Sequence, residues 1–172
     1  DSENRKPPKS GLDVPDTYRA EPDDITQEVI ALVEAHFPDH FGDLLPFHFA
    51  VTRDQALAAL DQFIAKRLSL FGDYQDAMLN DNKYLYHSII SIALNAGLLD
   101  PLDVCQQVEA AYRSGRVPIN AAEGYIRQII GWREYMRLVY IHKYDVLVNS
   151  NFFGNNYKLD KRWYKGTLDI YP

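Results

Sequence analysis

The chain has 172 residues, of which 47% are hydrophobic, so it is long enough and apolar enough to fold around a core. Its net charge of −6 argues, taken alone, against a nucleic-acid-binding protein. No apolar run approaches the ~18 residues that a membrane-spanning helix needs, and the polar first ten residues carry no secretory signal. The single cysteine, Cys105, forms no internal disulfide, which favours a reducing compartment and predicts a cytoplasmic protein.

The charge is unevenly distributed along the chain. Residues 1–112 carry eight Lys/Arg against nineteen Asp/Glu, whereas residues 113–165 carry ten against four. A basic C-terminal third therefore follows an acidic N-terminal part. Two solvated surfaces of opposite sign and a nucleic-acid contact in the basic part both explain this split.

Residues 1–22 contain four prolines and many charges, which predicts a linker or an arm lying on another surface. A first helix is expected from Asp23 or Asp24 to just before Pro38, with Ile25, Val29, Leu32 and Val33 on one face. Residues 39–49 follow as a loop with aromatic side chains.

Thr52, with Gln55 three residues later, has the pattern of a capping box and predicts a second helix that ends near Gly72. A loop over residues 72–84 then leads to a helix over residues 85–96. Asp100 and the proline after it predict an N-cap and first helical residue, which open a helix that runs to about residue 115.

Asn120, followed by Glu123, resembles another capping box, and the helix that it opens can run to about Tyr144. Residues 149–166 are polar and aromatic without a steady period. No β-alternation and no repeat is visible, so the sequence predicts an all-α fold, a multi-helix array in helix-on-helix layers.

The sequence has no phosphate-binding loop, dinucleotide-binding glycine motif, serine-hydrolase elbow or zinc-protease motif. Five histidines occur, but they form no recognised metal-binding motif. Nucleophilic, acid–base and metal chemistry are therefore not indicated by any motif.

The stretch "GYIRQIIGWREYM" (124–136) places charged residues in an apolar helical pattern. At α-helical spacing, Ile126, Ile130, Arg133 and Arg137 share one face, and Trp132 lies beside it. A guanidinium on such a face needs a carboxylate, a phosphate or an aromatic ring as partner. Either Arg133 pairs with an internal acid in an ordinary core helix, or this face lines a cavity for an anionic or aromatic ligand.

A second polar motif, "YHSIIS" (86–91), puts Ser88 and Ser91 near the expected start of a helix, with His87 adjacent. Hydroxyl groups and free backbone N–H groups at a helix start suit a phosphate. Serines that only cap the helix explain the same pattern.

Four segments together resemble one family: "FGDYQDAM" (71–78), "LYHSIISIALNAGLLDP" (85–101), "VPINAAEGYIRQIIGWREYMRLVY" (117–140) and "RWYKG" (162–166). They are similar, in this order, to the FAD-binding helical domain of the photolyase–cryptochrome superfamily. Within it they resemble the deoxyribodipyrimidine photolyase-related branch, the prokaryotic iron–sulfur (6-4) photolyases and cryptochromes. The resemblance covers about residues 25–166.

The resemblance implies a role for each matching residue. Trp132 matches the aromatic residue that packs against a flipped-out pyrimidine lesion, and Arg133 matches the arginine near the flavin and the lesion. Met136 and Arg137 match positions beside DNA and flavin. The remaining matches belong to the flavin-phosphate site, and they are Tyr74, His87, Ser88, Ile89, Ile90 and Ser91. His87 replaces the superfamily's threonine, a departure from the family pattern.

Members of this branch also hold a [4Fe–4S] cluster on four cysteines and a lumazine-type antenna. Cys105 matches the first cluster ligand, although a lone buried cysteine acting as a small hydrophobic residue explains it equally. With no initial Met and no C-terminal stop signal, the chain is expected to be a piece of a longer one. Residues 1–22 would be the arm and residues 23–172 an incomplete FAD-binding domain, whose partners include the remaining domains of the parent chain.

The implied function is light-dependent repair of UV-damaged DNA, specifically of (6-4) photoproducts, by electron transfer from reduced FAD. The parent protein would then be an enzyme, a DNA photolyase with no membrane partner, and this piece would be inactive alone. Two alternatives remain open at this point: a cryptochrome-type blue-light photoreceptor without repair activity, and a non-enzymatic helical interaction module.

Overall fold

The computed structural model describes residues 6–7 and 11–167, and within these residues the secondary structure is helical apart from an isolated bridge between Leu79 and Asn82. The all-α prediction is therefore confirmed. None of the helices within the described ranges is long and apolar enough to cross a membrane. In chain order the elements are α1 (Asp24–His36), α2 (Arg53–Lys66), α3 (Leu68–Tyr74), α4 (Ser91–Asn95), α5 (Pro101–Arg113), α6 (Ile119–Arg127), the π-helical segment η2 (Gln128–Glu134), α7 (Tyr135–Asn149) and α8 (Lys161–Lys165).

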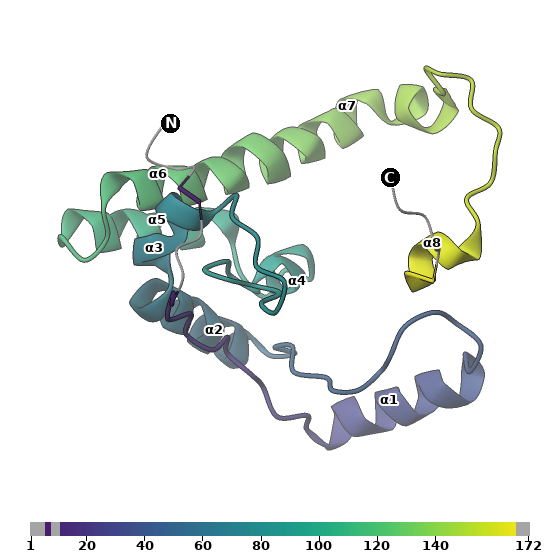
Figure 1. The fold of residues 1–172 in the computed structure, drawn as a ribbon, viewed down its shortest axis with the longest axis horizontal. Helices are drawn as coiled ribbons and strands as arrows, with labels where there is room; N and C mark the ends of the chain where they lie inside the picture. The colour runs from purple at the N-terminus through teal and green to yellow at the C-terminus, as the bar shows by residue number, and fades with distance from the viewer. Residues whose placement is uncertain (1–5, 8–10, 168–172) are drawn as a thin grey trace. The chain divides into compact units, whose positions relative to one another are not determined.

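The helices belong to two compact units (Figure 1). The first unit comprises residues 1–21 and 48–138, and it contains α2 to α6, η2 and the start of α7. The second unit comprises residues 22–47 and 139–172, and it contains α1, the rest of α7 and α8. The proposed domain division at residue 22 stays a prediction.

The predicted arm lies on the first unit. Lys6 donates from its backbone N–H to the carbonyl of Asp73 at 3.0 Å, and the hydroxyl of Tyr86 donates to the carbonyl of Asp13 at 2.8 Å. The backbone N–H of Ala20 donates to the carbonyl of His48 at 3.0 Å. These contacts hold the described part of the arm against α3, the segment around Tyr86 and the loop at His48.

In the second unit, α1 begins and ends where the sequence predicts. Asp23 is its N-cap, and one carboxylate oxygen accepts from Thr26 N at 2.8 Å. The apolar face of the helix is not buried, because Ile25, Val29 and Leu32 are all more than half exposed.

In the first unit, α2 opens with the predicted capping box. Thr52 Oγ1 accepts from Gln55 N at 3.3 Å, and Gln55 Oε1 accepts from Thr52 N at 3.3 Å. The predicted stop at Gly72 is wrong, because Gly72 lies inside α3 and is buried. A Cβ at this position would lie 2.6 Å from the backbone nitrogen of Ala121 in α6. Glycine is therefore required by the close approach of α3 to α6 rather than by a helix end.

The predicted helix over residues 85–96 is also wrong, since only α4 is helical there. Leu85 has a positive φ of 43°, which an α-helix cannot include. Asn82 holds this turn, because its side-chain oxygen accepts from the backbone N–H groups of Tyr84 and Leu85. Residues 85–90 therefore run as an irregular segment ahead of α4.

The N-cap of α5 follows the sequence prediction. Asp100 Oδ1 accepts from Leu102 N at 2.8 Å and from Asp103 N at 3.2 Å, and Pro101 occupies the first helical position. The helix ends at Arg113, with Ser114 as C-cap and Gly115 at a φ of 74°.

Replacing Asp100 with alanine is expected to lower the free energy of unfolding by about 1 kcal/mol, because two N–H groups lose their acceptor. Urea denaturation followed by circular dichroism measures this change. Asp61→Ala, at an exposed site inside α2, is the control and should shift the free energy by less than about 0.5 kcal/mol. Equal effects of the two substitutions would show that the cap does not stabilise α5.

The last long helical run differs from the prediction at its start and in its middle. Asn120 does not cap α6. Its side-chain amide donates instead, at 2.9 Å, to Oδ1 of Asp73, a residue of α3. The helix begins at Ile119 with Pro118 as N-cap. Its middle is the π-helical η2. The run is interrupted at Lys143, whose φ of −132° and ψ of 21° are not helical, next to the expected end at Tyr144, and helical structure resumes up to Asn149.

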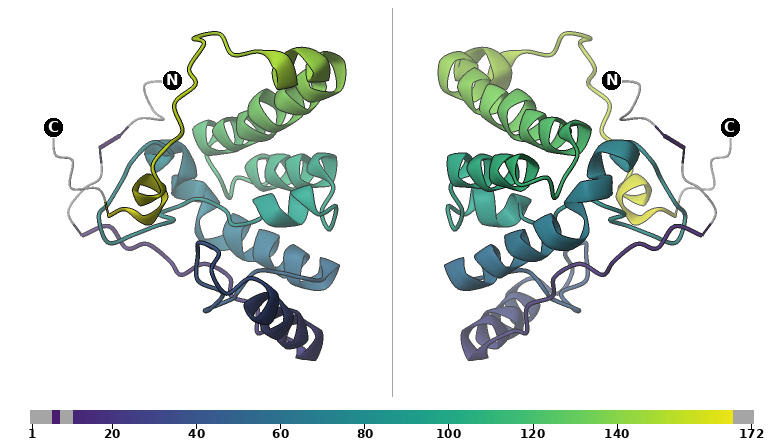
Figure 2. Two further views of the ribbon diagram at one scale, coloured as in Figure 1. Left: turned by 90° about the vertical axis from the view of Figure 1, so that its right-hand side faces the viewer. Right: turned by 90° about the vertical axis from the view of Figure 1, so that its left-hand side faces the viewer.

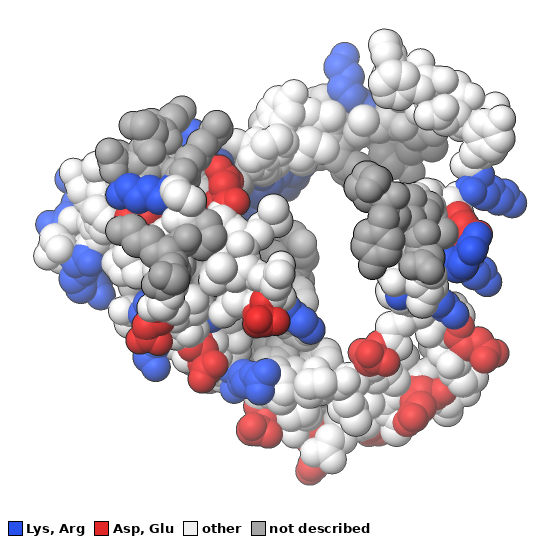
Figure 3. All heavy atoms as spheres, in the orientation of Figure 1, with Lys and Arg blue, Asp and Glu red and all other residues white. Residues whose placement is uncertain are grey.

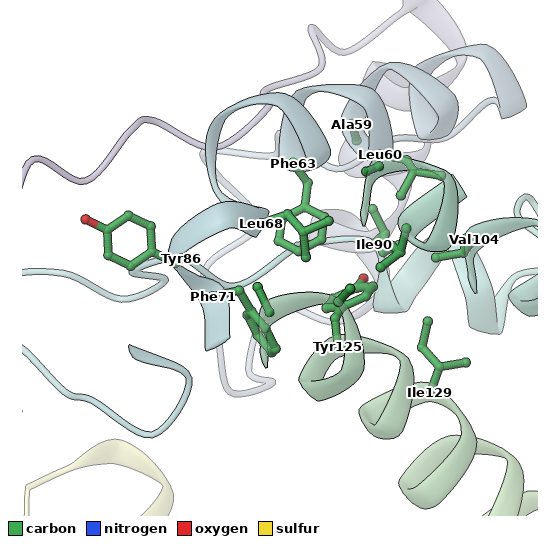
Figure 4. Close-up of a cluster of buried hydrophobic side chains, with 14 of the residues drawn as sticks. Ala59, Leu60, Phe63, Leu68, Phe71, Tyr86, Ile90, Val104, Tyr125 and Ile129 are labelled. Carbon is green, nitrogen blue, oxygen red and sulfur yellow. The ribbon is translucent and has the colours of Figure 1, made fainter. Parts of the chain in front are cut away.

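The buried core lies between α2, α3, α5 and α6 of the first unit, which appear as neighbouring layers in both views of Figure 2. Figure 4 shows Tyr125 and Ile129 pointing from the α6–η2 run into this cluster, where Tyr125 meets Phe63 and Phe71 at ring-centroid distances of 4.7 and 5.3 Å. The core thus fixes one face of the "GYIRQIIGWREYM" stretch.

Candidate cofactor-binding cavity

A cavity of about 690 Å³ opens on the first unit, beside the core. Its walls come from the end of α3, the segment around Ser88, α4 and the α6–η2–α7 run. The lining residues are Phe71, Gln75, Asp76, His87, Ser88, Ile90, Ser91, Leu94, Asn95, Tyr125, Gln128, Ile129, Trp132, Arg133 and Met136. The volume lies within the range of about 300–1,000 Å³ that small-molecule sites occupy.

One wall is the irregular segment that contains His87 and Ser88. Arg67, only 4% exposed, donates from Nη1 to the carbonyl of His87 at 2.8 Å and from Nη2 to the carbonyl of Pro15. The His87 ring is also held, since its Nε2 lies 2.9 Å from the carbonyl oxygen of Gln75. The wall is therefore held by the guanidinium donor of Arg67 on its backbone and by the carbonyl of Gln75 at the His87 ring.

Ser88 is tied to the core by a hydrogen bond between its hydroxyl and that of Tyr125, at 2.8 Å. Burial raises the pKa of Tyr125 well above its usual value, and the hydrogen bond from Ser88 opposes this shift only in part. The tyrosine is therefore neutral throughout the physiological range, and it anchors the serine as a hydroxyl.

The raised pKa of Tyr125 predicts a loss of stability at alkaline pH. The folded chain keeps the phenol protonated, whereas the unfolded chain loses that proton above a pKa of about 10. The contribution of the protonated Tyr125 to the free energy of unfolding is thus complete below pH ~10 and falls as the pH rises further. Denaturation from pH 8 to 11 should show a shallower alkaline decline for Tyr125→Phe than for the parent; identical slopes would contradict this linkage. Tyr112→Phe, at an exposed tyrosine, is the control.

The opposite wall carries Trp132 and Arg133 on η2. Trp132 is 66% exposed, so its ring is open to a ligand. Arg133 donates from Nη2 to the carbonyl of Leu94 at 3.2 Å, and Nη1 pairs with the carboxylate of Glu134. Its Nε is buried and has no hydrogen-bond partner among the residues that the structure describes. A buried donor of this kind is costly unless a ligand satisfies it.

The π-helical geometry decides which residues share the cavity face. In η2 the backbone hydrogen bonds join residues five apart, whereas in an α-helix they join residues four apart. Each turn of η2 therefore contains more residues than a turn of an α-helix. Arg133 consequently faces the cavity with Ile129, whereas Ile126 and Ile130 line a different groove of about 570 Å³ beside α5. The expectation that Ile126, Ile130 and Arg133 lie on one face is therefore wrong.

Of the predicted site residues, seven line the cavity together: His87, Ser88, Ile90, Ser91, Trp132, Arg133 and Met136. The others lie elsewhere. Tyr74 is 5% exposed and stacks on Tyr86 at 5.6 Å, Ile89 lines a small pocket next to Ala59, and Arg137 is ion-paired with Glu134 at 3.6 Å. The predicted roles of these three residues are not supported by a position at the cavity, and they remain predictions.

Ser88 and Ser91 do not share a helix start as expected, since Ser88 lies in the irregular segment and α4 has five residues. So short a helix has a small macrodipole, and the case for an anion therefore depends on the hydroxyl groups.

Cys105 lies on α5, half-buried against the core and outside the cavity. Burial, and then the charges of Asp100 and Glu134, raises the pKa of its thiol above the usual value. Among the described residues, no group of three or more His, Cys, Asp or Glu side chains could hold a metal ion. The assignment of Cys105 as a cluster ligand is not tested by these observations and remains a prediction.

Sequence reasoning missed several residues that shape the cavity. Glu134 accepts from Arg133 and faces Arg137, and the carbonyl of Leu94 fixes the Arg133 side chain. Glu134 stands next to Arg133 in the sequence and could have been considered. A backbone carbonyl on a distant helix leaves no sequence signal.

Comparison with known proteins adds evidence of ancestry. A family model described as "Deoxyribodipyrimidine photo-lyase-related protein" matches residues 1–49. The chain is also 51% identical over 166 residues, 96% of its length, to a (6-4) photolyase of Agrobacterium fabrum. Over nearly its whole length the chain is thus similar to a photolyase-related protein. This confirms the resemblance drawn from the four sequence segments.

The extent of these matches differs between relatives. The chain spans 33% of the length of the Agrobacterium (6-4) photolyase. It is 40% identical over 101 residues to an uncharacterized protein of Acanthamoeba polyphaga mimivirus, a match that covers 58% of this chain and 76% of that protein. The match to the (6-4) photolyase omits only a few residues of this chain. It therefore includes at least part of the sequence that lines the cavity.

Proposed function

We propose that this chain contributes one side of the flavin site of a light-dependent DNA photolyase that acts on (6-4) photoproducts. The observation that supports this best is the cavity that joins Trp132, Arg133 and Ser88 in a chain 51% identical to a (6-4) photolyase. FAD, when bound and reduced, supplies the light-driven electron that such a repair reaction needs.

The cavity residues fit a flavin cofactor by chemistry. Ile90, Leu94 and Ile129 offer apolar surface for a ring system, and the hydroxyl groups of Ser88 and Ser91 suit phosphate oxygens. The partnerless Nε of Arg133 is a buried donor suited to an anionic or carbonyl oxygen.

The residues of the chain would also act on DNA. The exposed ring of Trp132 is suited to stack on a base that has left the duplex, and Arg137 is exposed enough to meet a phosphate. Since the cavity is open on the Trp132 side, we expect the 172-residue chain alone not to retain stoichiometric FAD after purification; a yellow, FAD-loaded chain would contradict this expectation.

The experiment that tests the function uses the Agrobacterium (6-4) photolyase with its aligned segment replaced by this chain. We expect the purified hybrid to repair (6-4) photoproducts in DNA under blue light and not in the dark. A folded, flavin-containing hybrid that repairs no lesion would contradict the repair function and favour a photoreceptor. Cyclobutane dimers serve as the comparison substrate for lesion preference.

A further inference from the structure

Arg67, at the junction of α2 and α3, is the one charged residue that is buried within the described ranges of the chain, at 4% exposure. Figure 3 shows other Lys and Arg side chains, in blue, at the surface of the molecule, where water solvates their charge. A guanidinium loses that solvation on burial, so hydrogen-bond acceptors and negative charge must compensate it. The position of the Arg67 side chain therefore depends on the groups that supply this compensation.

The arm supplies part of the compensation. Arg67 donates from Nη2 to the carbonyl of Pro15. Burial lowers the pKa of Arg67, and the carboxylate of Asp16, also in the arm, opposes that shift. The other hydrogen bond of the guanidinium runs from Nη1 to the carbonyl of His87 at 2.8 Å, and its buried Nε has no hydrogen-bond partner among the described residues. One buried side chain thus joins the arm to the wall of the cavity.

A neighbouring contact joins the same two segments. The side chain of Tyr86 is 1% exposed, and its hydroxyl donates to the carbonyl of Asp13 at 2.8 Å. The residues on either side of Asp13 are partly buried and pack against the core. The arm is thus docked on residues 86–87, and Ser88, which follows them, lines the cavity.

We propose that Arg67 is a positioning residue through which the arm holds the wall of the cavity in place. When the arm leaves, the carbonyl of Pro15 and the charge of Asp16 leave with it, and the burial of Arg67 is no longer compensated. The guanidinium then turns toward water, which releases the carbonyl of His87 and loosens the wall at Ser88. Docking of the arm therefore regulates the cavity. The inference rests on the proposed function only for the identity of the ligand, a flavin.

Amide hydrogen exchange of the 172-residue chain tests this coupling without a flavin. Removing residues 1–21 takes away the arm, and the amides of residues 85–88 should then exchange at least about tenfold faster, because hydrogen bonds from a charged donor are lost. The N–H of His87, which donates to the carbonyl of Tyr84 at 2.8 Å, is one of these amides. The amides of α5 should change less than about twofold.

Two further chains complete this experiment. Removing residues 1–10 is the matched control, because it leaves the carbonyls of Asp13 and Pro15 in place and should not change the exchange of the wall. Tyr86→Phe in the full chain removes only the hydroxyl that donates to the arm. It should speed the exchange of residues 85–88 about twofold to tenfold, and this measurement does not depend on the folding of a shortened chain.

Conservative variants of the photolyase hybrid test the same coupling through FAD binding. Tyr86→Phe should raise the FAD dissociation constant about twofold to tenfold. Arg67→Lys keeps the charge but lacks the fork that reaches the carbonyls of both Pro15 and His87, so it should raise the constant further. Tyr84→Phe, at an exposed tyrosine of the same segment, is the matched control and should leave the constant unchanged.

Three results would overturn the inference. The first is equal exchange of residues 85–88 in the chains with and without the arm. The second is an equal acceleration in α5, which would indicate a general loss of folding rather than a released wall. The third is a hybrid that binds FAD equally well as Tyr86→Phe, Arg67→Lys and Tyr84→Phe. A hybrid without FAD would contradict the proposed function alone, because amide exchange still decides whether the arm holds the wall.

Discussion

Substitution of Gly72 by alanine is expected to destabilise the first unit by about 1–3 kcal/mol or more. The added Cβ would lie 2.6 Å from Ala121 N, 2.7 Å from Asn120 C and 2.8 Å from Ala121 Cα, all backbone atoms that cannot rotate away. Relief requires α3 and α6 to separate, which would loosen the packing of Phe71 against Tyr125. Urea denaturation of the two chains measures the loss.

The control for this prediction is Gly131→Ala. Gly131 is also helical, but a Cβ there would have its nearest neighbour, Arg127 Cγ, at 3.7 Å, which is ordinary contact. Alanine should be neutral or stabilise by up to about 1 kcal/mol at this position. If Gly72→Ala were as stable as Gly131→Ala, the close approach of α3 and α6 would be refuted.

Substitution of Arg133 by alanine in the photolyase hybrid should weaken FAD retention about tenfold to a hundredfold. A hydrogen bond to a charged partner contributes about 1.5–3 kcal/mol, and Arg133 is the cavity residue with a buried, partnerless donor. The measurement is the FAD dissociation constant, determined by flavin fluorescence after partial removal of the cofactor.

Two further variants separate a flavin contact from a general loss of folding. Arg133→Lys keeps the charge but lacks the Nε donor, so it should recover only part of the affinity. Arg113→Ala removes an exposed arginine of α5 and should leave FAD binding unchanged. If Arg133→Ala and Arg113→Ala retained FAD equally, Arg133 would have no role in binding the cofactor.

The features that sequence reasoning predicted correctly depend on neighbouring residues. Asp23, Thr52 and Asp100 each cap a helix through groups two or three residues away. Such contacts form wherever the local sequence permits them. The helix starts that they mark could therefore be predicted from the sequence alone.

The features that it missed depend on distant partners. Gly72 reads as a helix stop until α6 is seen to pass against it, and Asn120 reads as a cap although its amide bonds to Asp73. Residues 85–90 depend on Arg67, which reaches across twenty positions to the carbonyl of His87. Tertiary contacts decided the first two cases against the local preference, and in residues 85–90 a tertiary contact acts together with the local turn at Asn82.

The candidate site was predictable in its residues but not in its geometry. The motif residues Ser88, Trp132 and Arg133 do line one cavity. The α-helical period, however, assigned Arg133 to the face of Ile130, because no sequence pattern indicates the π-helical turns of η2. Tyr74 resembled a phosphate contact, yet it is buried against Tyr86.

The flavin content of the purified hybrid photolyase tests the central proposal most directly. Absorption in the blue, compared with protein absorbance, gives the amount of FAD per chain. If Trp132, Arg133 and Ser88 form one side of a flavin site, the hybrid should retain stoichiometric FAD through gel filtration. A folded hybrid that elutes colourless would contradict the assignment of this cavity to a flavin.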